Sequence, residues 1–130
     1  MKEITLIAKN EIGSLANVAE ALGAHGVNIE AISAHEEKGN AVFRIITTDT
    51  TTALKAISKF PEIKILQGET IIYTMINRPG ELGKITRKLS NKGISLESLY
   101  IVGRKAESTD VAIRPVPADL QKTKDALGIK

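Results

Sequence analysis

The sequence contains no cysteine and no tryptophan, and its only aromatic side chains are two Phe and two Tyr. Without cysteine, the chain can form neither a disulfide framework nor a thiolate metal site. No apolar run reaches the roughly 18 residues that span a bilayer. The apolar stretch in the N-terminal "MKEITLIAKNEIG" is too short and too interrupted for a signal peptide. We therefore expect a cytoplasmic protein that does not enter a membrane.

A strong excess of one charge is also missing. The 18 basic and 15 acidic residues leave a net charge of only +3, whereas nucleic-acid-binding surfaces usually gather basic side chains and often interleave them with aromatic ones. The densest basic stretch, from Lys84 to Lys92, has helical spacing, which is typical of a solvated helix face. We therefore expect no nucleic-acid partner. A nucleic-acid-linked regulator ranks third, after the two functions given at the end of this section.

Arrangements of catalytic or metal-binding residues are scarce. The two histidines, His25 and His35, belong to no His-x-x-His zinc motif and to no Ser-His-Asp set. No P-loop or dinucleotide fingerprint occurs. Glu30 and Glu97 occupy equivalent positions of a repeat described below, but they favour a structural salt bridge over acid–base catalysis. We expect no enzyme activity, no metal and no cofactor.

What the chain does contain is an internal repeat. The repeat period, which is the separation between Ile4 and Ile71, exceeds the roughly 20–50 residues of solenoid repeats. It therefore indicates a duplicated small domain. We predict two domains, residues 1–67 and 68–130. A single constant offset superimposes the identical pairs Ile4/Ile71, Asn10/Asn77, Gly13/Gly80, Leu15/Leu82, Leu22/Leu89, Gly26/Gly93 and Glu30/Glu97.

Each copy is predicted to contain the same string of elements. Short β-branched runs indicate strands, and apolar residues at spacings of three and four indicate helices. A phase slip near Glu30 and Glu97 predicts a β-bulge in each second strand. The first copy is predicted to have strand 3–8, a helix with Leu15, Val18 and Leu22, strands 27–35 and 41–47, helix 50–60 with a Thr N-cap and an inward face of Leu54, Ile57 and Phe60, and strand 62–66. The second has strand 70–76, a helix with Leu82, Ile85 and Leu89, strands 94–102 and 109–115, and helix 117–127.

The order strand-helix-strand-strand-helix-strand is typical of the ferredoxin-like fold, an α+β arrangement in which two helices cover one face of an antiparallel sheet. The second copy is expected to have a truncated last strand, because only "GIK" follows its second helix. A domain of about 60 residues buries only about 60% of its unfolded surface, and an exposed sheet edge invites pairing. We therefore predict packing between the copies and a homodimer.

The turn between the first strand and the first helix of each copy is a candidate anion site. Backbone N–H groups point out of a helix N-terminus, where the helix dipole is positive. Gly13 and Gly80 have no Cβ and allow a close approach. Asn10 and Asn77 offer carboxamides, and Pro79 suits the first helical turn. The turn therefore favours a small anion such as an α-carboxylate, although glycine and proline also mark such junctions where no ligand binds.

The residues from 77 to 99, "NRPGELGKITRKLSNKGISLESL", resemble the ACT domain pattern of a polar residue, Pro-Gly, Leu, a helix, Gly and a short apolar strand. Residues 10 to 32 are similar, with Ile12 in place of the usual proline. ACT domains are regulatory modules with the ferredoxin-like fold that are often attached to enzymes of amino-acid biosynthesis. They pair side by side and commonly bind amino acids at the pairing interface. The resemblance implies a tandem pair of such domains.

The resemblance also implies which residues contact the ligand. Arg78 stands where the first copy has Glu11: an inward Arg78 would favour an acidic ligand side chain and an inward Glu11 a basic one, and the alternative places both in solvent. Asn28 and Ser95 would face the ligand from the neighbouring domain. By the resemblance, the polar end of the ligand would lie against Asn10, Ile12, Gly13, Asn77, Pro79 and Gly80. Arg78 is a further candidate because the two copies differ at its position.

Two functions are therefore expected ahead of nucleic-acid regulation. The first is a regulatory protein that binds a free amino acid and acts by binding rather than by chemistry. The alternative is a protein-interaction subunit that docks on a separate enzyme of amino-acid metabolism. Because a fold does not dictate a function, both rest in part on the resemblance.

Overall fold

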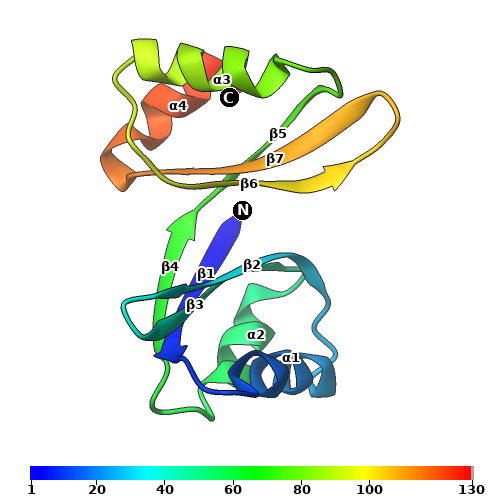
Figure 1. Cartoon of the computed structure of the whole chain (residues 1–130), viewed down its shortest axis with the longest axis vertical. Helices are drawn as coiled ribbons and strands as arrows, with labels where there is room; N and C mark the ends of the chain where they lie inside the picture. Colours follow the sequence, from blue (N-terminus) through cyan, green and yellow to red (C-terminus); the bar gives the residue numbers. More distant parts are fainter. Residues whose placement is uncertain (130) are drawn as a thin grey trace. The chain divides into compact units, whose positions relative to one another are not determined.

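The computed structural model describes residues 1–129 and divides into two compact units (Figure 1). The N-terminal unit comprises Lys2–Gln67, and the C-terminal unit joins Met1 to the residues from Gly68 onward. The backbone N–H of Thr70 donates to the carbonyl oxygen of Met1 at 2.7 Å, which attaches the first residue to the C-terminal unit.

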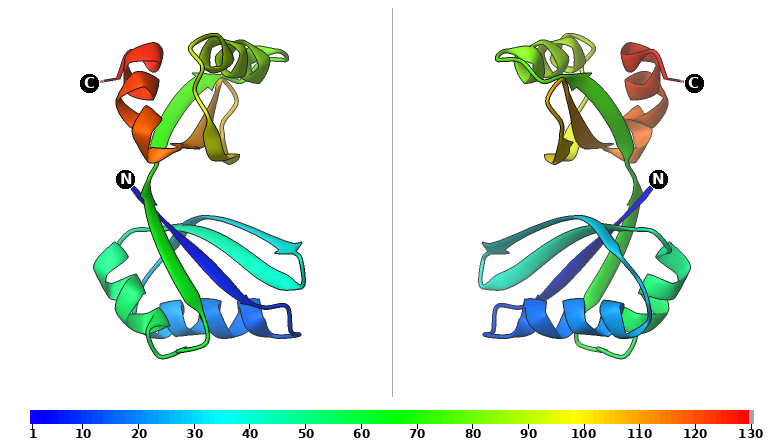
Figure 2. Two further views of the ribbon diagram at one scale, coloured as in Figure 1. Left: turned by 90° about the vertical axis from the view of Figure 1, so that its left-hand side faces the viewer. Right: turned by 90° about the vertical axis from the view of Figure 1, so that its right-hand side faces the viewer.

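The N-terminal unit has a four-stranded sheet in the order β2-β3-β1-β4. Strand β3 pairs antiparallel with both β1 and β2, and the two helices lie on one face of the sheet (Figure 2). This is the ferredoxin-like α+β arrangement expected from the order of elements. The elements are β1 (Lys2–Lys9), α1 (Ser14–Ala24), β2 (Ile29–Glu37), β3 (Asn40–Thr47), α2 (Thr50–Ile57) and β4 (Lys64–Glu69).

The C-terminal unit repeats this order through its second helix. Its described residues form a three-stranded antiparallel sheet in the order β5-β7-β6. The prediction of a truncated last strand concerns the end of the chain, and residue 130 lies outside the described residues. The elements are β5 (Ile71–Ile76), α3 (Glu81–Asn91), β6 (Leu96–Arg104), β7 (Ser108–Pro115), the 3₁₀ turn η1 (Pro117–Asp119) and α4 (Leu120–Leu127).

Each unit has its own hydrophobic core between sheet and helices. Leu22 on α1 and Leu89 on α3 occupy equivalent positions of the repeat, and both side chains are fully buried. In the N-terminal unit Leu22 packs with Ile4 and Ile45, and in the C-terminal unit Leu89 packs with Ile71 and Ile113. The apolar spacing of three and four therefore identified the buried positions Val18, Leu22 and Leu89. The prediction is wrong for Leu15, which is 39% exposed at the start of α1.

Both predicted β-bulges are confirmed. The register between β2 and β3 shifts between Ile29 and Ala31, and the register between β6 and β7 shifts between Leu96 and Ser98. An extra residue in one strand changes which side chains face the core, so the alternation of apolar residues slips at the same place. Each bulge leaves its glutamate at the surface, and Glu97 forms an ion pair with Arg114 at 3.2 Å.

Several local predictions are wrong in detail. The N-cap of α2 is Asp49, which has an extended backbone. Its carboxylate accepts hydrogen bonds from the N–H and the hydroxyl of Thr52 at 3.1 and 2.6 Å. The helix ends at Ile57, so that Phe60 lies in the following turn, and β4 begins at Lys64 instead of position 62. Pro79 lies one residue before the N-cap Gly80 and is therefore outside the first turn of α3.

Candidate functional site

The two strand-to-helix turns have almost the same backbone geometry. Gly13, the N-cap of α1, has φ 90° and ψ −5°, and Gly80, the N-cap of α3, has φ 86° and ψ −10°. This left-handed region is readily adopted by glycine alone. A Cβ built on either glycine meets no atom of the described chain within 4 Å, so both turns are open to an incoming group.

Neither glycine can supply a capping side chain to its helix. Within the described residues, α1 and α3 have no side-chain hydrogen bond at the N-cap, in contrast to α2. The glycine carbonyls still accept the first helical hydrogen bonds, from Asn17 at 2.9 Å and from Lys84 at 3.1 Å. The remaining first-turn N–H groups are where a helix N-terminus can hold an anion.

The N-terminal turn is highly exposed. The backbone N–H of Asn10 donates to the carbonyl oxygen of Gly39 at 3.3 Å, which attaches the turn to the β2–β3 hairpin. Ile12, at the position where the second copy has Pro79, is fully exposed. The hydroxyl of Ser14 donates to the carbonyl oxygen of Lys9 at 3.1 Å, so this side chain closes the turn and does not cap the helix.

The C-terminal turn is more heavily bonded within its own unit. The Asn77 carboxamide nitrogen donates to the carbonyl oxygen of Lys105 at 2.9 Å, and its backbone N–H donates to Glu107 at 3.0 Å. The side chain of Arg78 turns back along the helix and donates to the Glu81 carboxylate, with an Nε–Oε1 distance of 2.8 Å. Arg78 therefore forms an ion pair with Glu81 and does not stand free as a ligand for an acidic group.

The charges at this turn also shift a carboxyl group. The Arg78 hydrogen bonds, followed by that of Lys84 at 3.2 Å, hold the pKa of Glu81 below its ordinary value. The helix dipole favours a negative charge at the same position. In the N-terminal turn Ser14 replaces Glu81, so only the C-terminal helix begins with a carboxylate of its own.

Asn28 and Ser95 lie at the other end of each sheet. The carbonyl oxygen of Asn28 accepts from the N–H of Thr48 at 3.3 Å, and the N–H of Ser95 donates to the Asp119 carboxylate at 2.9 Å. The registers place the glycine turns at the opposite end, where Lys9 pairs with Asn40. A single unit therefore does not bring the two groups of predicted ligand-binding residues together.

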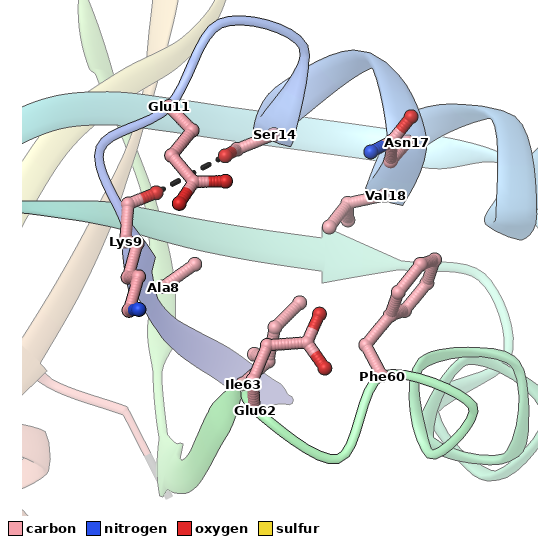
Figure 3. A pocket seen from close by; sticks show the side chains of 9 residues that line it. All are labelled: Ala8, Lys9, Glu11, Ser14, Asn17, Val18, Phe60, Glu62 and Ile63. Atoms are coloured by element: carbon pink, nitrogen blue, oxygen red, sulfur yellow. Dashed lines mark hydrogen bonds between the residues drawn. The ribbon is translucent and has the colours of Figure 1, made fainter.

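A cavity of about 220 Å³ lies beside the N-terminal turn (Figure 3). The sequence predictions assigned most of its lining to no site, because the residues come from two stretches that lie far apart in the sequence. An inward Glu11 is the one sequence feature that pointed to this cavity. The cavity is lined by Ala8, Lys9, Glu11, Ser14, Asn17, Val18, Phe60, Glu62 and Ile63.

Residues 1–129 contain no group of three or more His, Asp or Glu side chains that could hold a metal ion. No helix in this part of the chain is long and apolar enough to cross a membrane.

Comparison with known protein families finds a match for the N-terminal unit. The ACT domain family model matches residues 2–60, which contain the N-terminal turn and most of its unit. None of the curated protein sequences matches the chain.

Solved structures extend the likeness to the whole chain. Protein BT0572 from Bacteroides thetaiotaomicron is 26% identical, with a TM-score of 0.84 over 98% of this chain and 85% of that one. The regulatory subunit of aspartate kinase from Thermus thermophilus is 16% identical, with a TM-score of 0.70 over 98% and 89% of the two chains. The corresponding subunit from Thermus flavus is 14% identical, with a TM-score of 0.67 over 98% and 90%. Residues 2–60 therefore match the ACT domain family, and the second unit repeats the ferredoxin-like fold of the first.

Proposed function

We propose that this chain is a regulatory protein that binds a free amino acid at its glycine turns and acts by binding, without catalysing a reaction. The observation that supports this proposal is the repeated geometry of Gly13 and Gly80, two N-caps that leave their helices without a side-chain cap in the described structure. First-turn N–H groups and the helix dipole together favour the α-carboxylate of an amino acid.

The proposed site needs residues from a second domain. Asn10, Ile12 and Gly13 lie at one end of their sheet, and Asn28 lies at the other. We propose that the chain forms a cytoplasmic homodimer in which Asn28 or Ser95 of a neighbouring domain completes the site. The equivalent contacts in the C-terminal turn would come from Asn77, Pro79 and Gly80, since Arg78 is already paired with Glu81.

A second candidate function is a docking subunit for an enzyme of amino-acid metabolism. The internal bonding of the C-terminal turn favours it, because the Asn77 carboxamide and the Arg78 guanidinium already have partners within their own unit. A turn whose polar side chains already have hydrogen-bond partners should gain less binding free energy from a ligand than the open N-terminal turn. We therefore propose that the N-terminal turn is the stronger amino-acid site.

A thermal-shift screen of the common amino acids tests the proposed function. A ligand with few heavy atoms is expected to bind with micromolar to millimolar affinity. At about one hundred times the dissociation constant it adds about 2.7 kcal/mol to the free energy of unfolding, which raises the Tm of a chain of this size by several degrees. One amino acid or a few related ones should give this shift, and matched carboxylates without the α-amine should not.

Glycine variants locate the site. Gly13→Ala should remove the shift, because its Cβ stands where the carboxylate approaches and its φ of 90° is strained for alanine. Gly26→Ala is the matched control, since Gly26 has φ 71° and open space around its Cβ position but lies at the far end of α1. Both variants should lose about 1 kcal/mol of stability, and only the first should lose binding. Silence of every amino acid at millimolar concentration would support the docking subunit instead.

A further inference from the structure

One wall of the cavity in the N-terminal unit is formed by the segment between α2 and β4. Helix α2 ends at Ile57, and two successive turns then bring the chain under α1 before β4 begins. The N–H of Phe60 donates to Ile57 at 2.9 Å, and the N–H of Ile63 donates to Phe60 at 3.1 Å. These hydrogen bonds hold Phe60 and Ile63 opposite Val18 of α1 (Figure 3).

The floor of the cavity is apolar and continuous with the core. Val18 is a fully buried member of the N-terminal core, and Phe60 and Ile63 are partly buried residues packed against the same core. Side chains that belong to a packed core have little freedom to collapse into the opening. The cavity can therefore accept a short hydrocarbon chain.

The mouth of the cavity carries negative charge. Glu11 and Glu62 both line it, and Figure 3 shows their carboxylates directed toward the space between α1 and the segment from Phe60 to Ile63. Within residues 1–129, neither carboxylate has a hydrogen bond or an ion pair. Lys9 also lines the cavity, so two negative charges and one positive charge face the opening.

We infer that this cavity binds the ammonium end of a small primary alkylamine, with its hydrocarbon chain against Val18, Phe60 and Ile63. Two carboxylates attract the cation, and the aromatic ring of Phe60 adds to this attraction if the ammonium lies within about 6 Å of it. The volume of about 220 Å³ is below the roughly 300–1,000 Å³ of pockets for drug-sized ligands, which limits the ligand to a few heavy atoms. The cavity adjoins the proposed carboxylate site, but the inference uses the side chains of Glu11 and Glu62, whereas that site uses Gly13 and the first-turn N–H groups of α1, so the two can be tested separately.

The C-terminal unit provides an internal comparison. At the position of Glu11 it has Arg78, which is paired with Glu81, and at the position of Glu62 it has Ile129. The repeat therefore conserves neither carboxylate, and the cation site is expected in the N-terminal unit alone.

Titration of the full chain with n-butylammonium chloride, followed by amide chemical shifts, tests this inference. The amides of Val18, Phe60 and Ile63 should shift along a saturating curve with a dissociation constant on the order of 1 mM or weaker. Butan-1-ol has the same hydrocarbon chain without the charge, and sodium chloride controls for ionic strength. Both should leave these amides nearly unchanged.

Charge variants separate a specific site from general attraction. Glu11→Gln and Glu62→Gln should each weaken butylammonium binding by about three- to fivefold, as expected for a partly exposed ion pair, and the double variant by about tenfold or more. Glu20→Gln removes the same charge from α1 outside the cavity lining and should bind normally. Shifts that do not saturate, butanol that binds as tightly, or an equal loss in Glu20→Gln would each overturn the inference.

Discussion

Glu81 makes the C-terminal turn differ from the N-terminal turn. Its carboxylate stands at the first position of α3 and accepts hydrogen bonds from Arg78 and Lys84. At the equivalent position Ser14 uses its hydroxyl on the carbonyl oxygen of Lys9. A helix that begins with its own carboxylate has less need of an anionic ligand, because the same dipole and N–H groups are already stabilised.

The lowered pKa of Glu81 predicts a pH dependence of stability. A depressed folded-state pKa means that the ionised carboxylate stabilises the fold above the pKa of the unfolded chain, about 4.3, and that this contribution disappears as the pH falls through the folded-state pKa. Glu81→Gln should therefore be less stable than the unchanged protein at pH 7 and nearly equal to it well below pH 4. Urea unfolding at several pH values measures the difference.

Glu107→Gln is the matched control for this prediction. It changes the same charge, but the Glu107 carboxylate has no ion pair in residues 1–129. Its stability relative to the unchanged protein should vary little with pH. A Glu81→Gln difference that stays constant from neutral to acid pH would contradict the assigned ion pair.

The helices differ in how their N-termini are satisfied. Helix α2 has Asp49 as a side-chain cap, and hydrogen bonds from Thr52 hold the pKa of this carboxyl below its ordinary value. Helices α1 and α3 begin instead at glycines in the left-handed conformation. Serine, threonine, aspartate and asparagine are better caps than glycine, so the glycine turns sacrifice some helix stability. We attribute this to their proposed role as binding sites.

Asp49 gives an element-scale prediction. Asp49→Ala should lower the Tm by a few degrees, because the N–H of Thr52 loses its acceptor. Asp49→Asn keeps an oxygen acceptor and should be considerably less destabilising at neutral pH. Thermal unfolding followed by circular dichroism compares the two, and equal losses would show that the charge of Asp49, and not its cap geometry, stabilises α2.

At the scale of the whole molecule, the two units have separate hydrophobic cores of unequal size. The N-terminal core includes buried residues from two helices and two strands, whereas fewer fully buried side chains form the core of the C-terminal unit in the part of the chain described. A unit of about 60 residues is marginally stable alone. We expect each unit to depend on the rest of the chain or on a second copy.

Separate expression of residues 1–67 and 68–130 tests this expectation. The first fragment should unfold at a lower urea concentration than the full chain or should aggregate. The second should be less stable still, because its described sheet has three strands instead of four. Circular dichroism with light scattering measures both, and a cooperatively folded monomer of residues 1–67 as stable as the full chain would refute the prediction.

Local pattern was sufficient to predict most of the fold. The offset between Leu22 and Leu89 revealed the duplication, the spacing of apolar residues identified most of the buried helix positions but not the exposed Leu15, and the phase slips at Glu30 and Glu97 located both bulges. These features are periodic along the chain, so they can be recognised without knowledge of distant contacts. The ends of α2 and β4 were less predictable, because capping depends on the geometry of individual side chains.

Only the tertiary structure decided what surrounds the turns. The sequence left the direction of Arg78 and Glu11 open, and the structure pairs Arg78 with Glu81 and places Glu11 beside a cavity. That cavity joins Glu11 to Phe60 and Glu62, which lie far apart in the sequence and meet because the chain turns back under α1 after α2. Contacts of this kind have no period along the chain, since they depend on how loops and elements pack in three dimensions.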